Sequence, residues 1–430
     1  MRGQRRVLKQ GQSTQERVIK VVHPTCCGID VHKSDVKACL VFQDENGQRD
    51  QQVRTFGTMT DDIIELSKWL LAHQCPIIAL ESTGVYWKPL FNLLEQDFEI
   101  LLVNPVQVKQ LAGRKTDVRD CRFIAEYLEH GLLSGSYIPE RAIRDLKDLS
   151  RYRRKLTQQR TDETNRVHKV LETGNIKLSS VATDIMGVSG RAILQSLLEG
   201  LCTPEEMAEL SKGRLRNKKT ELARALKGNL RPHQVIILTQ MLDHIDYLDD
   251  CIAKLEEEMD KICAPFEEQI GHLSTIPGVK RCCAIDLIAE TGVNMESFPS
   301  DAHFASWGGM CSGNNESAGK SKSGKTRKGS KWIRSILTEA AKAASITKDT
   351  FLSEQFRRLA RRKGAPRATM AVGHTIMTIA YHILKDNTSY RELGSDYHDK
   401  INKKRNQNYF VGRLERMGLK VTVEDLALAA

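Results

Sequence analysis

The chain has 430 residues, of which 40% are hydrophobic and 28% charged, with 11 Pro and 29 Gly. This length exceeds what one hydrophobic core usually organises, so we expect two or three domains, and the composition excludes collagen-like, low-complexity and wholly disordered chains. The N-terminus lacks the apolar segment of a secretory signal, and no run approaches ~18 consecutive apolar residues. The sequence therefore predicts a cytoplasmic protein with no membrane partner.

The net charge of +11 is concentrated in one region. Residues 320–367 hold fifteen Lys and Arg against three Asp and Glu, an excess of +12, so the rest of the chain sums to −1. A concentrated positive segment on a near-neutral chain indicates a polyanionic partner, and nucleic acid is favoured over membrane because no basic amphipathic anchor accompanies it. A solvated charged surface is the alternative. The 11 cysteines include no CxxC pair, which favours small buried side chains over disulfides or structural zinc.

The N-terminal third predicts an α/β domain after a flexible basic arm over residues 1–21. Three β-type runs, CCGIDVHK, KACLVFQ and QQVRTF, are separated by turn signals, with ENGQ as a hairpin connection. They are followed by helix (TDDIIELSKWLLAHQ), strand (PIIALE), helix (VYWKPLFNLLEQ), strand (FEILLVN) and a further helix over residues 117–130. We expect a mixed sheet over residues 22–140, with its last two strands added in parallel and helices on its faces.

Long helices dominate from residue 141 to about residue 265. Apolar residues step by 3, 4, 3, 4, 3, 4 and 3 along the most regular segment, and they are Leu238, Met241, Ile245, Leu248, Ile252, Leu255, Met259 and Ile262. This is the a/d seam of a coiled coil. We interpret it as association between chains, although a buried hairpin within one chain would produce the same pattern.

The remainder predicts a mainly helical C-terminal domain over residues 266–386 and a tail over residues 387–430. The segment HLSTIPGVKRCCAIDLIAETG is similar to a helix-hairpin-helix, in which turn amides and a helix N-terminus face a phosphate. A Gly/Ser/Lys-rich loop, GNNESAGKSKSGKTRKGSK, then connects two helices. The tail carries short helices and no chemistry that its pattern identifies.

Four carboxylates in the first domain indicate a metal site. Asp30 and Glu81 each end a predicted strand, while Asp117 and Asp120 stand at i, i+3 near the start of one helix and so share a face. Converging carboxylates without lysine partners repel one another, and divalent metal is the usual compensation. One or two Mg²⁺ ions would suit phosphodiester chemistry. Taken singly, each acid also fits an ordinary role as a helix cap or strand end.

With this order of acids on a ribonuclease-H-like frame, the sequence resembles a known family. GIDVHK, ALESTGVYW and NPVQVKQLAGRKTDVRDCRFIAEYL look like the DEDD (RuvC-like) domain of the bridge-RNA-guided "one-ten" insertion-sequence transposases. IPGVKRCCAIDLIAETG and FASWGGMCSGNNESAGKSKSGKTRKGSKWIRSILTEAA resemble the C-terminal transposase domain of that family. The resemblance covers about residues 23–385 and includes a coiled coil between the two domains.

The resemblance implies particular site residues. Asp30, Glu81, Asp117 and Asp120 match its four metal-binding acids, and Ser317 in NNESAGK matches its serine nucleophile. Other serines in the loop (Ser312, Ser321, Ser323) are alternative registers, and CSG stands where the family has CPG. A serine hydroxyl needs activation, and no histidine is near it in the loop, so the metal cluster would have to supply this role. Candidate nucleic-acid contacts are Arg114, Lys115, Lys320, Lys322, Lys325, Arg327, Lys328, Lys331 and Arg334. The alternative is that this loop is a solvated linker with no role in binding or catalysis.

The predicted function is transposition, in which DNA strands are cut and rejoined by Mg²⁺-bound DEDD carboxylates and a transient phosphoserine. The resemblance implies donor and target DNA, a bridge RNA whose pairing supplies sequence specificity, and a dimer-based tetramer acting at the bacterial nucleoid. One alternative is a RuvC-like Holliday-junction nuclease that uses water as the nucleophile. Another is a non-catalytic RNA-binding scaffold with vestigial acids.

Overall fold

The computed structural model describes residues 20–44, 47–82, 84–104, 117–313, 315–317, 320–323, 326 and 329–423. The side chains of residues 117–119, 315–317 and 320–323 are outside this description. The chain divides into two compact units, Met1–Ile138 and Pro139–Ala430, and each is described by itself. No helix in the described ranges is both long enough and apolar enough to cross a membrane.

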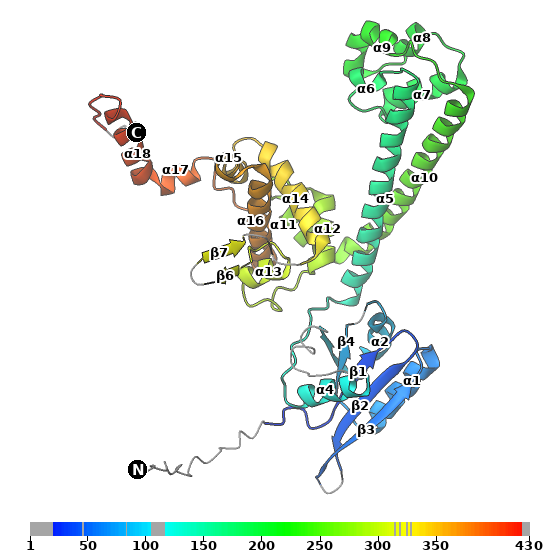
Figure 1. Cartoon of the computed structure of the whole chain (residues 1–430), viewed down its shortest axis with the longest axis vertical. Helices are drawn as coiled ribbons and strands as arrows, with labels where there is room; N and C mark the ends of the chain where they lie inside the picture. Colours follow the sequence, from blue (N-terminus) through cyan, green and yellow to red (C-terminus); the bar gives the residue numbers. More distant parts are fainter. Residues whose placement is uncertain are drawn as a thin grey trace, which may run out of the picture. The chain divides into compact units, whose positions relative to one another are not determined.

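The N-terminal unit is built on a five-stranded mixed sheet, shown in blue and cyan in Figure 1. Its strands are β1 (Cys26–Val31), β2 (Val36–Gln43), β3 (Arg49–Phe56), β4 (Ile77–Glu81) and β5 (Glu99–Val103). The order is β3-β2-β1-β4-β5, with an antiparallel meander and parallel pairing of β1 with β4 and β4 with β5. The predicted meander and the parallel addition of the last two strands are confirmed.

Three helices cover the two faces of this sheet, and alternation along the strands sorts the core into two layers. They are α1 (Thr60–Ala72), α2 (Trp87–Leu94) and α4 (Asp117–Glu129). One layer joins Ile29 and Leu80 to α1 and α2, whereas the other joins Cys26 and Ala79 to α4. β1 is buried along its whole length because both of its faces are covered, as for the central strand of an α/β sheet. Charged and polar residues fill β3, which suits an exposed edge.

The second unit begins with a long antiparallel helical hairpin of α5 (Arg141–Thr173) and α10 (Pro232–Cys263), which run side by side in Figure 1. Short helices fill its far end: α6 (Leu178–Val181), α7 (Val188–Glu199), α8 (Pro204–Glu209), the 3-10 turn η1 (Gly213–Lys218) and α9 (Lys219–Ala225). Long helices are thus found at both ends of the region over residues 141–265, whereas the segment between them consists of short helices.

The heptad seam of α10 packs within this chain. Every one of its eight apolar positions is buried or half-buried, and Leu238 and Ile245 join a core with Val167 and Leu171 of α5. The hairpin alternative therefore accounts for the seam, whereas we had preferred association between chains. Because the seam is buried within the chain, a second chain could contact only the exposed faces of these two helices.

The rest of the unit is helical, in agreement with the prediction of a mainly helical domain. Its helices are η2 (Ala264–Phe266), α11 (Glu267–Ser274), α12 (Arg281–Thr291), α13 (Asp301–Trp307), α14 (Lys331–Ile346), α15 (Phe351–Lys363) and α16 (Ala365–Asp386). The tail adds α17 (Tyr397–Ile401) and α18 (Lys403–Glu415). Eight consecutive residues of α12 from Ala284 to Thr291 are buried, so most of this helix lies inside the unit. The loop predicted between α13 and α14 contains a small hairpin of β6 (Asn315–Ser317) and β7 (Lys320–Ser323).

Candidate functional site

The first pair of predicted acids lies on neighbouring parallel strands. Ile29 of β1 pairs with Leu80 of β4, and Asp30 and Glu81 are the next residue on each strand. Residues at the same level of adjacent parallel strands point to the same face, so both acids belong to the layer that α4 covers. Asp30 is only 3% exposed, while Glu81 is half-buried.

Helix α4 approaches this edge of the sheet unusually closely because β1 carries a glycine. A Cβ atom on Gly28 would lie 2.2 Å from the backbone N of Ala125 and 2.5 Å from the carbonyl O of Cys121. The thiol of Cys26 donates to the Ala125 carbonyl at 3.6 Å, so α4 runs antiparallel to β1 and its first turn lies toward the end of the strand that carries Asp30.

The second acid pair continues the row of α4 residues that faces the sheet. Asp117 stands four residues before Cys121, and Asp120 stands four before Ile124; both Cys121 and Ile124 are fully buried against the sheet. Burial raises the pKa of the Cys121 thiol to about 12, and the negative charge of neighbouring Asp30 adds to the rise after that of Cys39. Asp30 is thus close to the first two turns of α4.

The carboxylates that this arrangement gathers have the oxygen chemistry that hard divalent cations prefer. Asp30, Glu81 and Asp120 have described side chains, whereas the Asp117 side chain is outside the description. Over the described residues, no cluster of three or more His, Cys, Asp or Glu side chains is tight enough to count as a ready-made metal site. The donor set fits Mg²⁺, with the positive end of the α4 macrodipole as a further source of stabilisation for the acids.

His32 lies beside the first acid. Its Nε2 atom is 3.1 Å from Oδ2 of Asp30, and the histidine side chain is 37% exposed against 5% for the aspartate. The short distance makes His32 a partner of the Asp30 carboxylate at this edge.

Ser317 is the last residue of β6, opposite Lys320 at the start of β7. The hairpin thus presents the predicted nucleophile at its tip, and one further bridge, between Ser312 and Thr326, closes its base. Among the alternative serines, Ser321 and Ser323 lie on the returning strand and Ser312 lies at the base. Only the backbone of Ser317 is described, so its role as nucleophile stays a prediction.

A groove of about 920 Å³ adjoins the base of this hairpin. Ser312 and Thr326 line it together with basic and polar side chains of three helices: Arg334 of α14, Gln355 and Lys363 of α15, and Arg367, His374 and Thr375 of α16. Lys363 and Arg367 are exposed, whereas Arg334 is half-buried and donates to the carbonyl of Gly309 at 3.3 Å. Its cations, Arg334, Lys363 and Arg367, have the charge that a phosphate would need, and of these the sequence analysis predicts only Arg334 as a nucleic-acid contact.

The other predicted nucleic-acid contacts divide as follows. Lys331 is exposed at the start of α14, with its Nζ 5.4 Å from the ring centroid of Trp332. Five lie outside the described residues, namely Arg114, Lys115, Lys325, Arg327 and Lys328. Two have only their backbones described, namely Lys320 and Lys322. The predicted helix-hairpin-helix is a helix–turn–helix connection from α11 to α12, and its role in binding stays a prediction.

Sequence reasoning missed a buried ionic network that joins α5 to α12 and α14. Arg153 donates to Asp286, and Arg154 donates to Asp286 and to Glu339. Arg151 forms a bidentate pair with Glu290. The only signal in the sequence is the basic run RYRR in a helix, which by itself is typical of a solvated surface.

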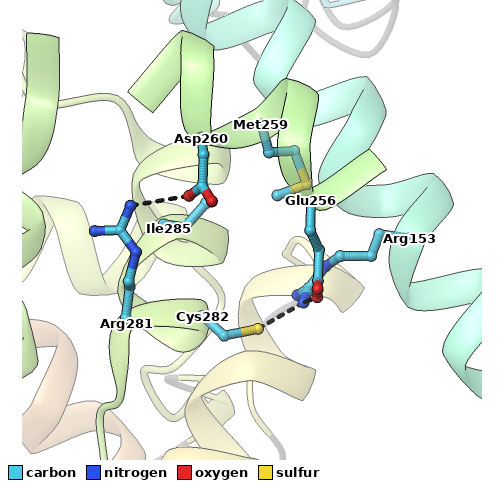
Figure 2. Close-up of a pocket in the computed structure, with 7 residues that line it drawn as sticks. All are labelled: Arg153, Glu256, Met259, Asp260, Arg281, Cys282 and Ile285. Carbon is cyan, nitrogen blue, oxygen red and sulfur yellow. Dashed lines mark hydrogen bonds and ion pairs between the residues drawn. The ribbon is translucent and has the colours of Figure 1, made fainter. Parts of the chain in front are cut away.

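A cavity of about 270 Å³ lies beside this network and is shown in Figure 2. Arg153 donates to Cys282 at 2.6 Å and to Glu256 at 3.0 Å there, while Arg281 donates to Asp260 at 2.9 Å. Each cation in the view is paired with an acid or a thiol. We therefore interpret this cavity as part of a structural joint between the hairpin and the C-terminal helices.

Comparisons with known proteins found two family models and two solved structures that match parts of the chain. The DEDD model of the IS110 group, described as "Transposase", matches residues 27–176, and a model described as "Transposase IS116/IS110/IS902 family" matches residues 271–357. No curated protein matches the chain. Two structures of RuvC from Thermus thermophilus, one of them in complex with a Holliday junction substrate, match at 13% identity and a TM-score of 0.20, each covering 26% of this chain and 99% of its own.

Proposed function

We propose that this chain, which carries the two transposase domains of the IS110 family, is the transposase of an insertion sequence and cuts and rejoins donor and target DNA. The observation that supports this most directly is the position of α4. Its first turn, with Asp117 and Asp120, lies toward the strand ends that carry Asp30 and Glu81. This path of the chain would bring acids from three elements far apart in the sequence to one edge of one sheet.

These acids would hold one or two Mg²⁺ ions. Bound there, Mg²⁺ would neutralise the charge that develops on a phosphodiester during cleavage. Among the three acids with described side chains Asp30 is the most buried, so its carboxylate would be held most rigidly of the three, with His32 against one oxygen. Glu81, at a half-buried strand end, would be more accessible than Asp30 to a DNA strand.

Ser317 is the proposed nucleophile. Its Oγ would attack the phosphorus of the scissile phosphodiester and lose its proton to a nearby base, while the bond from phosphorus to the leaving deoxyribose oxygen breaks and that oxygen takes up a proton. The resulting phosphoserine would be attacked by a hydroxyl of the other strand end, which releases the serine and rejoins DNA. The groove beside the hairpin, with Lys363 and Arg367, would hold the flanking phosphates.

Two further parts of the proposal concern partners. A noncoding bridge RNA would choose the donor and target sites by base pairing, so the protein would bind RNA through its shape and backbone. A dimer-based tetramer would bring the acids of one subunit to the serine hairpin of another. Because the heptad seam of α10 is used within the chain, association would have to involve other surfaces of the hairpin helices.

The test is a covalent adduct. Wild type, Ser317→Ala and Asp120→Asn are incubated with Mg²⁺, labelled element-end DNA and RNA transcribed from the flanks of the element, and then separated on a denaturing protein gel. A labelled adduct that requires both residues supports the proposal. Cleavage without an adduct that persists in Ser317→Ala would instead assign a nuclease with water as its nucleophile, and cleavage by none of the proteins would favour the binding scaffold.

A further inference from the structure

Helix α15 forms a wall of two adjoining grooves. Gln355 and Leu359 line both the groove at the base of the serine hairpin and a second groove of about 740 Å³ that extends to the tail helices α17 and α18. We call this second one the tail groove. Basic residues of α15 lie on both sides of the shared pair, so a single chain of phosphates could follow the helix from one groove to the other.

The tail is held against the domain by specific contacts. Arg358 of α15 donates to Asp399 of α17 at 2.6 Å, and the ring of Phe351 stacks on His398 with centroids 5.0 Å apart. Upstream, the backbone N–H of Tyr390 donates to the hydroxyl of Thr275 at 2.8 Å. The tail groove is therefore a feature of the folded unit, with one wall from α15 and the other from α17 and α18.

The lining of the tail groove is cationic and rich in hydrogen-bonding groups. It consists of Gln355, Arg358, Leu359, Arg361, Arg362, His398, Asn402, Arg405, Asn406 and Tyr409. No acidic side chain lines it within the described part of the chain, although Glu354 and Asp399 border it and pair with Arg358. Arg361, Arg362 and Arg405 carry no recorded ion pair to an acid in the described ranges, so their charges are available to a ligand.

The helix dipole alone does not explain this arrangement. Arg361 and Arg362 lie in the last turn of α15, where cations stabilise the C-terminus of a helix. Arg405, however, lies in the first turn of α18, where a cation opposes the helix dipole, and yet it lines the same groove. Cations of α15 and α18 thus line the tail groove together, although the dipole of α18 disfavours a cation in its first turn.

The tail groove also contains an exposed aromatic ring, which could stack on a base. Tyr409 is 60% exposed at the groove, and Phe410 next to it on α18 is also 60% exposed. A ring left in solvent beside arginines and carboxamides is the combination that stacks on an unpaired base while the cations hold its phosphates. Paired bases of a duplex are stacked on one another and would not need such a ring.

We propose that the tail groove binds single-stranded nucleic acid, with Arg361, Arg362 and Arg405 on phosphates and Tyr409 stacked on a base. The residues of this binding site are different from the predicted acids and from those of the serine hairpin, and the site gives the tail after Asn387 a function. It extends the proposed transposase, but binding does not depend on cleavage and can be measured without it.

The test is fluorescence anisotropy of labelled 20-nucleotide single-stranded DNA, single-stranded RNA and duplex DNA with the full chain in EDTA, which prevents Mg²⁺-dependent cutting. We expect Arg361→Ala/Arg362→Ala to weaken binding of single strands at least tenfold and to flatten the salt dependence, because fewer counterions are released. We expect Tyr409→Ala to weaken it about tenfold and Tyr409→Phe to preserve it, because stacking needs the ring and not the hydroxyl.

The matched control is Arg357→Ala/Lys400→Ala, which removes two charges from α15 and α17 outside the groove, where Arg357 pairs with Glu354 and Lys400 with Asp396. If this control weakens binding as much as the groove variant, or if Tyr409→Ala binds single strands like wild type, the proposal is overturned. If wild type binds either single-stranded DNA or single-stranded RNA more tightly than the other probes, and Tyr409→Ala loses this preference, the proposal is supported. The preferred strand then shows whether the ligand is DNA or RNA. If single strands bind as proposed while no adduct forms at Ser317, only the proposed function fails.

Discussion

Arg153 and Asp286, 133 residues apart in the chain, meet through two hydrogen bonds from one guanidinium nitrogen to the two carboxylate oxygens, at 3.0 and 2.9 Å. The arginine side chain is 8% exposed and the carboxylate 1%. Ser150 also donates to this carboxylate at 2.6 Å, and Arg154 donates to it at 3.0 Å. The pair fixes the long hairpin to α12, the most buried helix of the C-terminal domain.

Replacing this carboxylate should strongly destabilise the second unit. Asp286→Ala leaves the buried guanidinium group of Arg153 and the half-buried one of Arg154 without their shared partner, and breaking a buried pair from one side costs about 3–5 kcal/mol. Thermal unfolding followed by circular dichroism would show the loss. Glu257→Ala, which removes an exposed partner of Lys261, should change stability by less than about 1 kcal/mol. Equal effects from the two variants would contradict a structural role for Asp286.

The buried acid on β1 should be essential for cutting. Asp30→Asn keeps the shape of the side chain but removes its charge, so we expect Mg²⁺-dependent cleavage to fall by about a hundredfold or more, as for loss of a metal-supporting group. Gel assays of labelled element-end DNA measure the rate. Asp61→Asn, an exposed residue of α1, is the matched control and should cleave like wild type. Undiminished cleavage by Asp30→Asn would remove this residue from the site.

The close approach of α4 depends on Gly28. A methyl group there would overlap Ala125 and Cys121, so Gly28→Ala should push the helix from the sheet, lower the unfolding temperature and reduce cleavage together. Gly271→Ala in α11, where a Cβ meets nothing within 4 Å, should instead be neutral or stabilise by up to about 1 kcal/mol. Wild-type cleavage by Gly28→Ala would show that the acids do not depend on this packing.

The groove at the base of the serine hairpin should bind DNA phosphates. Lys363→Ala/Arg367→Ala removes two exposed cations, so affinity for element-end duplex should fall, and the slope of log affinity against log salt should decrease by about 2. Lys20→Ala/Lys68→Ala serves as a charge-matched control on the other unit. An unchanged slope in the groove variant would mean that phosphates do not bind here.

Alkaline pH should destabilise the N-terminal unit through its buried thiols. Burial raises the pKa of Cys39 to about 11 and that of Cys75 to about 12, whereas an unfolded thiol titrates near its ordinary value of 9.0. The folded unit then binds more protons above pH 9, so its stability is complete below that pH and is lost as the pH rises toward 11–12. Unfolding temperatures measured from pH 8 to 11 test this. Cys75→Ala should flatten the decline, and Cys202→Ala, at an exposed position, should leave it unchanged.

Local pattern was sufficient to predict much of the first unit. Alternation in CCGIDVHK and KACLVFQ, turn residues between them and helical spacing after residue 60 predict the order of elements, because period and turn chemistry are local properties of the chain. The same pattern predicts that Asp30 and Glu81 each end a strand; in the structure Glu81 is the last residue of β4, whereas β1 continues for one residue after Asp30. The resemblance added Ser317, which no local pattern would single out among the serines of its loop.

Other features depend on contacts between distant residues. The heptad pattern of α10 could not reveal whether the seam packs on α5 of the same chain or on a second copy, because either arrangement buries the same apolar residues. The partner of Arg153 lies in α12, and the tail groove exists only because α15 and α18 meet, so neither has a signature in either segment alone. The sequence by itself determined the elements and the chemical types of the site residues, whereas tertiary packing decided which of them share a surface, because that depends on long-range burial and not on local spacing.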